Sequence, residues 1–147
     1  LNNCEKIITP LNIALSNKTK IEQLHLTSIE AGSSGHGVSG NFSNENKIIK
    51  TLTVLTQTLD NIINSYHISK PNHIKIDVDG IEHLILAGAA VVLKKVDSIL
   101  IEIDENFEEQ SQKSNKYLTD AGLILSDRHV LNGVNDRQTN QLWIRQA

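Results

Sequence analysis

Acidic side chains lie at the ends of two apolar segments and are the clearest candidates for chemistry in this sequence. Asp77, Asp79 and Glu82 follow one apolar segment, and Glu102 and Asp104 close the next one along the chain. A carboxylate within hydrogen-bond reach of a substrate hydroxyl can accept its proton, which is the role of a general base. The pattern therefore predicts a catalytic site that includes Asp77, Asp79 and Glu82.

The same acids also have structural interpretations. Asp79 with Glu82 three residues later has the spacing of a capping box, in which the first side chain caps a helix and the second reaches back. Acids in the first turn of a helix are stabilised by its dipole. A second helix is expected to have such a turn, formed by Asp104, Glu105, Glu108 and Glu109.

Candidate substrate-binding residues lie beside these acids. Lys75 and Asp77 share one face of a strand that we expect to be buried, where they either neutralise each other or present a polar group to a substrate. Glu102 closes the neighbouring strand. His36 and His83 are the two histidines placed to contact a substrate hydroxyl, and the six histidines lack the paired spacing of a zinc site.

Strands and helices alternate along the chain, as in an α/β fold. Apolar patterning predicts strands at residues 6–15, 21–26, 48–54, 73–78, 98–103, 123–125 and 141–145. It predicts helices from Thr58 to Tyr66, at 81–95 and at 104–121, and a long polar loop at 28–46. We expect a mostly parallel sheet with helices on both faces and with antiparallel closing strands. Ligands of such sheets bind at the carboxyl ends of the strands, where the acids lie.

Composition limits the possible classes of protein. The chain has 147 residues, of which 39% are hydrophobic and 3% aromatic, which suits a single domain. A net charge of −3 without a basic block argues against nucleic acid or an anionic membrane as partner. No apolar run is long enough to span a bilayer. The single cysteine, Cys4, and the absence of a signal-peptide pattern predict a cytoplasmic location.

The segment from residue 73 to residue 89 carries a family resemblance. Its sequence, HIKIDVDGIEHLILAGA, resembles the I-K-I-D-V-E-G-x-E-x-x-V-L-x-G-A signature of the FkbM family of S-adenosylmethionine-dependent methyltransferases. Asp79 stands where that family usually has Glu. Further matches occur in the family's order at residues 12–16 (NIALS), 58–60 (TLD), 99–103 (ILIEI), 125–128 and 140–145.

The resemblance implies a Rossmann-like class I methyltransferase sheet and S-adenosyl-L-methionine as cofactor. It implies methyl transfer to a hydroxyl of a sugar, a glycan or a secondary metabolite. It also implies that Ala14, Leu15 and Ser16, at the end of an early strand, border the adenine of the cofactor.

The family's glycine-rich cofactor turn and its ribose-binding acid are not found in this sequence. The stretch from Gly32 to Gly40 is no substitute, because it follows an antiparallel strand and leads into no helix. The sequence contains no methionine and begins with Leu1. We therefore expect residues 1–147 to be one partial domain, truncated at its N-terminus.

Alternative functions come from the short motif Asp77-Val78-Asp79-Gly80. Haloacid-dehalogenase phosphatases present a nucleophilic and an acid/base aspartate in this way, with magnesium between the two carboxylates. Ile81 stands where that family has Thr or Val. A DxD metal site of a nucleotide-sugar glycosyltransferase is equally short. An inactive binding module is the third alternative.

Overall fold

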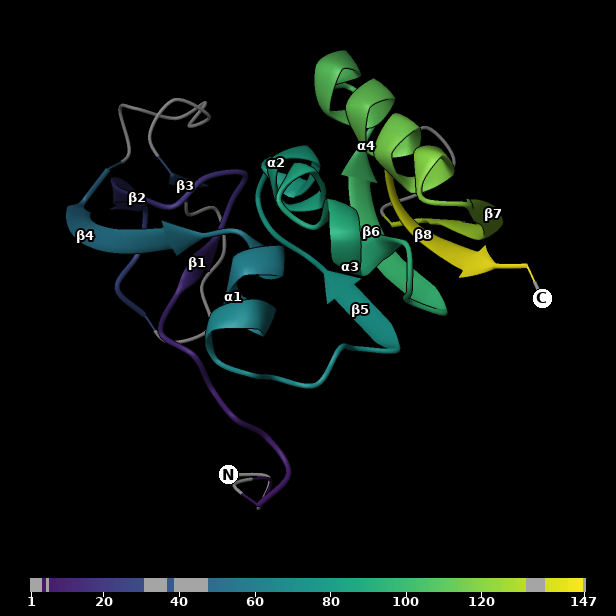
Figure 1. The fold of residues 1–147 in the computed structure, drawn as a ribbon. Helices are drawn as coiled ribbons and strands as arrows, with labels where there is room; N and C mark the ends of the chain where they lie inside the picture. The colour runs from purple at the N-terminus through teal and green to yellow at the C-terminus, as the bar shows by residue number, and fades with distance from the viewer. Residues whose placement is uncertain (1–3, 5, 31–36, 39–47, 132–136, 147) are drawn as a thin grey trace.

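The described part of the chain forms two four-stranded sheets and four helices (Figure 1). A computed structural model describes residues 4, 6–30, 37–38, 48–131 and 137–146. The mixed α/β character that the sequence predicts is confirmed. None of the described helices is both long enough and apolar enough to cross a membrane.

The first sheet has the strand order β1-β4-β2-β3. Its strands are β1 (Ala14–Leu15), β2 (Lys20–Leu26), β3 (Gly37–Val38) and β4 (Lys50–Gln57). β1 runs parallel to β4, and β2 pairs antiparallel with both β4 and β3. The predicted strands at 21–26 and 48–54 are therefore confirmed, with somewhat different ends.

The strand predicted at residues 6–15 is wrong over most of its length. Only Ala14 and Leu15 are extended against a neighbour, whereas the side chain of Ile7 is 83% exposed. Of the predicted strand, only these two residues pair with β4, opposite Thr56 and Gln57. Pro10 also lacks the N–H that a sheet ladder uses.

The second sheet has the strand order β5-β6-β8-β7. Its strands are β5 (His73–Ile76), β6 (Ser98–Asp104), β7 (Leu123–Val130) and β8 (Gln138–Arg145). β5 and β6 are parallel neighbours, and β7 and β8 close the sheet antiparallel, as predicted. The closing strands are longer than their apolar cores at 123–125 and 141–145 suggest.

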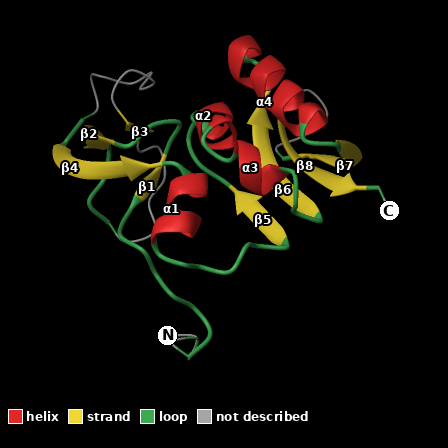
Figure 2. Cartoon of the chain, in the orientation of Figure 1, coloured by secondary structure: helices red, strands yellow, loops and turns green. Residues whose placement is uncertain are grey.

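The expectation of one mostly parallel sheet covered on both faces is not met by the described residues. Two of the six strand pairings are parallel. Helices α2, α3 and α4 gather on one face of the second sheet (Figure 2). Ile99, Ile101 and Ile103 are fully buried on that face, while Leu100, which points to the opposite face, is 37% exposed.

Helix α1 (Leu59–Ser65) and helix α4 (Glu108–Asp120) begin in different ways. Thr58 caps α1 as predicted, because its hydroxyl accepts the Asn61 N–H at 3.1 Å. α4 begins later than predicted, so Asp104 and Glu105 precede it and do not form its first turn. Asp104 ends β6, and its carboxylate accepts the N–H of Asn106 at 2.8 Å.

The single helix predicted at 81–95 is broken into α2 (Glu82–Ala87) and α3 (Ala90–Leu93). Gly88 lies at the break and is pressed against the end of β1. A Cβ on Gly88 would overlap the carbonyl oxygen of Ser16 and lie 3.2 Å from Cβ of Thr58. Gly88 therefore faces protein and not water, as its place in the apolar pattern predicts.

Asp60 stabilises the new helix start that this break creates. Its N–H donates to the Gly88 carbonyl at 3.1 Å. Its two carboxylate oxygens accept the N–H groups of Val91 and Val92, both at 2.9 Å. This carboxylate satisfies amides that the first turn of α3 would otherwise leave without partners.

Arg145, at the end of β8, stabilises the C-terminal ends of two helices. Its guanidinium donates to the carbonyls of Leu93 at 2.7 Å, Val96 at 2.9 Å and Ala121 at 3.0 Å. A cation is favourable at a helix C-terminus because the last carbonyls carry partial negative charge. The closing strand thereby ties α3 and α4 to the sheet.

Candidate functional site

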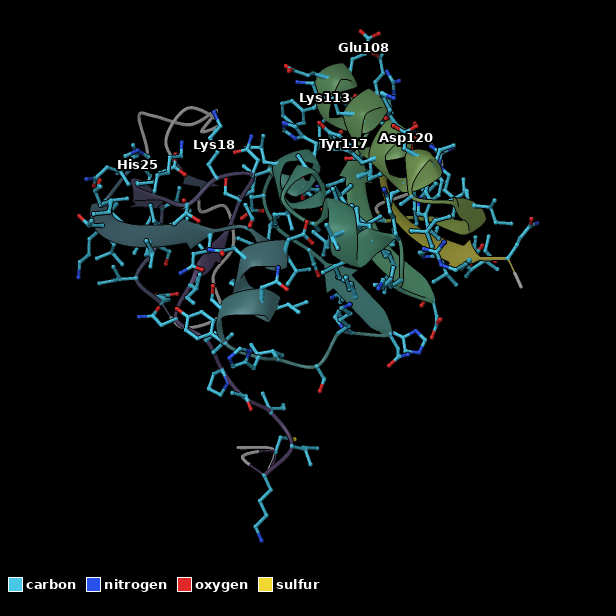
Figure 3. All side chains as sticks on the ribbon, viewed as in Figure 1. Lys18, His25, Glu108, Lys113, Tyr117 and Asp120 are labelled. Atoms are coloured by element: carbon cyan, nitrogen blue, oxygen red, sulfur yellow. The ribbon has the colours of Figure 1, made fainter. Side chains whose placement is uncertain are left out.

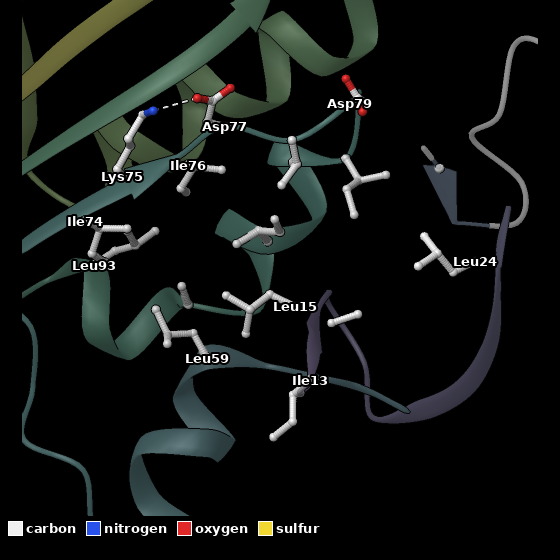
Figure 4. Close-up of a pocket in the computed structure, with 16 residues that line it drawn as sticks. Ile13, Leu15, Leu24, Leu59, Ile74, Lys75, Ile76, Asp77, Asp79 and Leu93 are labelled. Carbon is white, nitrogen blue, oxygen red and sulfur yellow. Dashed lines mark hydrogen bonds and ion pairs between the residues drawn. The ribbon is translucent and has the colours of Figure 1, made fainter. Parts of the chain in front are cut away.

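A groove of about 540 Å³ lies between β1, the edge strand of the first sheet, and β5, the edge strand of the second (Figure 4). Its lining is mostly aliphatic, with Leu15, Leu59, Ile74, Ile76, Ile85 and Leu93 among its residues. Its polar side chains come from β5 and the loop after it: Lys75, Asp77 and Asp79. The groove thus combines an apolar body with one charged rim at the carboxyl end of β5.

Lys75 and Asp77 form an ion pair at this rim, with 2.6 Å between Nζ and Oδ2. The hydrogen bond to Asp77 raises the pKa of Lys75. The two side chains are 61% and 50% exposed, so the expectation that they are buried is wrong. β5 lies at the edge of its sheet, and Lys75, in register with Leu100, points to the face that the helices leave uncovered.

Asp79 lies in the turn between β5 and α2 and does not cap that helix. The N-cap of α2 is Ile81, without a side-chain hydrogen bond, so the capping-box prediction is wrong for Asp79. The second half of the predicted capping box, in which Glu82 reaches back, is retained, because Oε1 of Glu82 accepts the Gly80 N–H at 3.4 Å. Gly80 has φ of +97°, a backbone conformation that L-residues rarely adopt. Its neighbour Asp79 is thereby left at the rim of the groove.

Glu82 is a buried carboxyl group, with 2% of its surface exposed. Burial raises its pKa to about 7, although hydrogen bonds from the Gly80 N–H and from Gln110 favour its charged form. The Gln110 side chain donates from Nε2 to Oε2 of Glu82. Glu82 does not reach the groove lining among the described residues, so it stands behind the rim.

Gln110 is a residue that the sequence analysis missed. It is 4% exposed and lies on α4. Ser114 and Leu118, four and eight residues later, are also buried, so these three residues mark the inner face of the helix. Figure 3 shows the charged side chains Glu108, Lys113 and Asp120 elsewhere on the same helix. The four-residue spacing was the available signal.

Glu102, on β6, belongs to the same group of carboxylates. Oε1 of Glu102 accepts the Gln138 side chain at 2.9 Å. Partial burial raises the pKa of Glu102 most, and the negative charges of Asp77 and Asp79 raise it further. Asp77 and Asp79 therefore lie within electrostatic reach of Glu102, and Lys75 is paired with Asp77. In the part of the chain that the structure describes, no three His, Cys, Asp or Glu side chains are arranged to hold a metal.

The described residues place neither candidate histidine in this group. His83 is 9% exposed and is not among the described residues of the groove lining. Burial lowers its pKa most, and the charge of Lys113 on α4 lowers it further. Its Nδ1 has no hydrogen-bond partner within the described residues. His36 lies outside the described residues.

The predicted adenine-bordering residues divide into two groups. Ala14 and Leu15 line the groove. Ser16 is 5% exposed and is packed under Gly88, and its N–H donates to the Gln57 carbonyl at 2.9 Å. Ala14 and Leu15 are thus open to a ligand, whereas Ser16 joins β1 to β4 and to the helix break.

Comparison with known proteins gives one result. The model of the FkbM methyltransferase domain matches residues 1–128. Searches of curated proteins and of solved structures gave no match. The matched span covers most of the chain and contains β1, the groove lining and the four candidate carboxylates, so the chain belongs to the FkbM methyltransferase domain family.

Proposed function

We propose that this chain carries the acceptor side of an S-adenosylmethionine-dependent O-methyltransferase site. The observation that carries the proposal is the groove between β1 and β5, whose charged rim is formed by Lys75, Asp77 and Asp79. The methyl acceptor is a hydroxyl of a sugar, a glycan or a secondary metabolite. A hydroxyl bound at this rim lies beside carboxylates and beside an apolar wall.

The acceptor oxygen must lose its proton as it bonds to the methyl carbon. Asp77 or Asp79 accepts that proton, because both carboxylates line the groove. Lys75, paired with Asp77, holds one carboxylate at the rim and offers its remaining N–H groups to acceptor oxygens. Glu82 is buried behind the rim, so its part is to position the turn that carries Asp79.

The described residues fit part of the cofactor. The groove is within the size range of small-molecule sites, and the aliphatic side chains beside Ala14 and Leu15 suit an adenine ring. When bound, S-adenosylmethionine supplies a methyl group that leaves its sulfur for the attacking oxygen, giving S-adenosylhomocysteine. Gly80 is the one glycine in the described strand-to-helix turns.

Replacement of Asp77 tests this proposal. Transfer of tritiated methyl from S-adenosylmethionine is measured on a panel of sugars, glycans and hydroxylated metabolites. Asp77→Asn should lower turnover at least roughly tenfold, since loss of acid–base help generally costs about a hundredfold or more. Cofactor affinity should change little, because Asp77 acts on the acceptor.

Asp120→Asn is the matched control. Asp120 is also an exposed aspartate paired with a lysine, at 2.7 Å from Lys116, but it lies on α4 and not at the groove. Full methyl transfer by folded Asp77→Asn would refute Asp77 as the base and leave that role to Asp79. Magnesium-dependent phosphate release that this change abolishes would support the phosphatase alternative. An absence of transfer by the parent on the whole panel would support the inactive module.

A further inference from the structure

We propose that Gln110, on α4, is a positioning residue for the turn that carries Asp79. This inference rests on the proposed function, because it gives Gln110 a role at that same site. Gln110 is 4% exposed, and its side-chain N–H donates to Glu82, which is 2% exposed. The other oxygen of Glu82 accepts the Gly80 N–H. A continuous hydrogen-bonded path thus runs from α4, through the first residue of α2, to the turn at the groove rim.

The turn needs such support because of its backbone conformation. Gly80 has φ of +97°, and nothing lies within 4 Å of the position where its Cβ would be. No side chain packs against that position, so the turn depends on its backbone hydrogen bonds: the Gly80 N–H is shared between the Val78 carbonyl, at 3.1 Å, and Glu82. A glycine has more conformational freedom than other residues, and these hydrogen bonds reduce it. The orientation of Gly80 in turn fixes where Asp79 points.

Charge at Glu82 decides how firmly this path is held. Burial raises the pKa of Glu82 most, and the negative charge of Glu102 on β6 raises it further. Gln110 on α4 and the Gly80 N–H favour the carboxylate form. On α2 itself, burial lowers the pKa of the neighbouring His83 most. The charge of Lys113 on α4 lowers this pKa further, and the charge of Glu109 raises it. Removing the Gln110 donor leaves Glu82 buried with one stabilising partner fewer, so its carboxylate form becomes less favourable.

A purely structural role for Gln110 has different consequences. Ser114 and Leu118 share its buried face, so an apolar side chain of similar length at position 110 fills the same space. If Gln110 only fills space, Gln110→Met changes global stability at most and leaves the turn unaltered. If Gln110 positions the turn, the change acts locally on Glu82 and Gly80.

The test uses Gln110→Met in the purified protein, followed by NMR. Amide exchange of Gly80 should increase at least roughly tenfold, whereas exchange of Ile101, in the centre of the second sheet, should not. The carboxyl resonance of Glu82 should titrate at higher pH than in the parent. Gln112→Met is the matched control, because Gln112 lies on the same helix and donates at 2.7 Å to the exposed Glu108. It should alter neither measurement.

In Gln110→Met, the inference is overturned by unchanged Gly80 exchange and Glu82 titration, and equally by the same acceleration at Gly80 and Ile101. If Gln110→Met does not fold, Gln110→Glu keeps the size and donates only when protonated. Gly80 exchange in that variant, corrected for its intrinsic rate, should rise with pH, and a pH-independent value overturns the inference.

Where the parent transfers methyl, Gln110→Met should lower kcat and leave the KM for S-adenosylmethionine unchanged, and an unchanged kcat overturns the inference. Where the parent transfers none, the proposed function fails and the NMR data alone decide the role of Gln110.

Discussion

Glu82 is a carboxyl group whose ionisation opposes folding. Burial raises its pKa from an ordinary 4.5 to about 7 in the folded chain. Between these two pH values the folded state binds more protons than the unfolded state, so the stability that this group contributes is present at low pH. It is lost as the pH rises toward about 7 and changes little above that.

Glu82→Gln should remove this pH dependence, because a neutral amide replaces the titrating group. Each unit of pKa shift corresponds to about 1.4 kcal/mol, so the stability of the parent relative to the variant should fall by about 3 kcal/mol between pH 4 and pH 8. Urea unfolding at several pH values measures the difference. Glu108→Gln, an exposed acid in the first turn of α4, should leave the slope unchanged. Parallel curves for the parent and Glu82→Gln would contradict the prediction.

The sequence predicted those parts of the candidate site in which the location of a side chain follows directly from its position on a strand. Asp77 follows β5 and Glu102 lies on the adjacent parallel strand β6, so their proximity was foreseeable. The exposure of Lys75 was not, since it depends on the second sheet having one uncovered face. Gln110 was missed because a glutamine on a helix is usually exposed, and only its burial against Glu82 distinguishes it.

At the level of elements, the break between α2 and α3 depends on distant parts of the chain. The apolar spacing at 81–96 is that of one continuous helix, and the weak helix propensity of Gly88 is the local sign of a break. The contacts at the break come from distant parts of the sequence: the Ser16 carbonyl, just after β1, and the N–H of Asp60, in α1. Periodicity predicts an element and its buried face, but not an interruption that another sheet imposes.

Gly88→Ala should destabilise the protein because a methyl group has no room beside Ser16. Added atoms in a packed interior typically cost about 1–3 kcal/mol, and here the opposing atom belongs to the backbone, which cannot rotate away. Thermal and urea unfolding measure the loss. A stability within about 0.5 kcal/mol of the parent would show that β1 and the helix pair separate easily.

At the level of the whole molecule, the groove is bounded by the edges of two sheets. Ala14 and Leu15 offer an apolar surface, but the described strand-to-helix turns offer a single glycine to the charged end of a cofactor. We therefore expect these 147 residues alone to bind S-adenosylmethionine weakly, with a Kd above roughly 100 µM. Isothermal calorimetry measures it. A Kd in the low micromolar range would mean that the cofactor contacts are complete within this chain.

The position of β5 at the edge of its sheet also bears on how the protein behaves at high concentration. An edge strand presents unpaired backbone groups to which a strand of another molecule can add, and a lysine on such a strand opposes this. Lys75 interrupts an otherwise apolar run, and Lys75→Ile would leave three consecutive isoleucines on the edge.

Light scattering should therefore show that Lys75→Ile self-associates at concentrations where the parent remains monodisperse. Lys20→Ile is the control, since Lys20 is also paired with an acid two residues later but lies on β2, an inner strand of the first sheet. Equal scattering by both variants would contradict the prediction. Self-association of Lys75→Ile alone would mean that the lysine at the groove rim protects the chain against aggregation as well as contributing to its site.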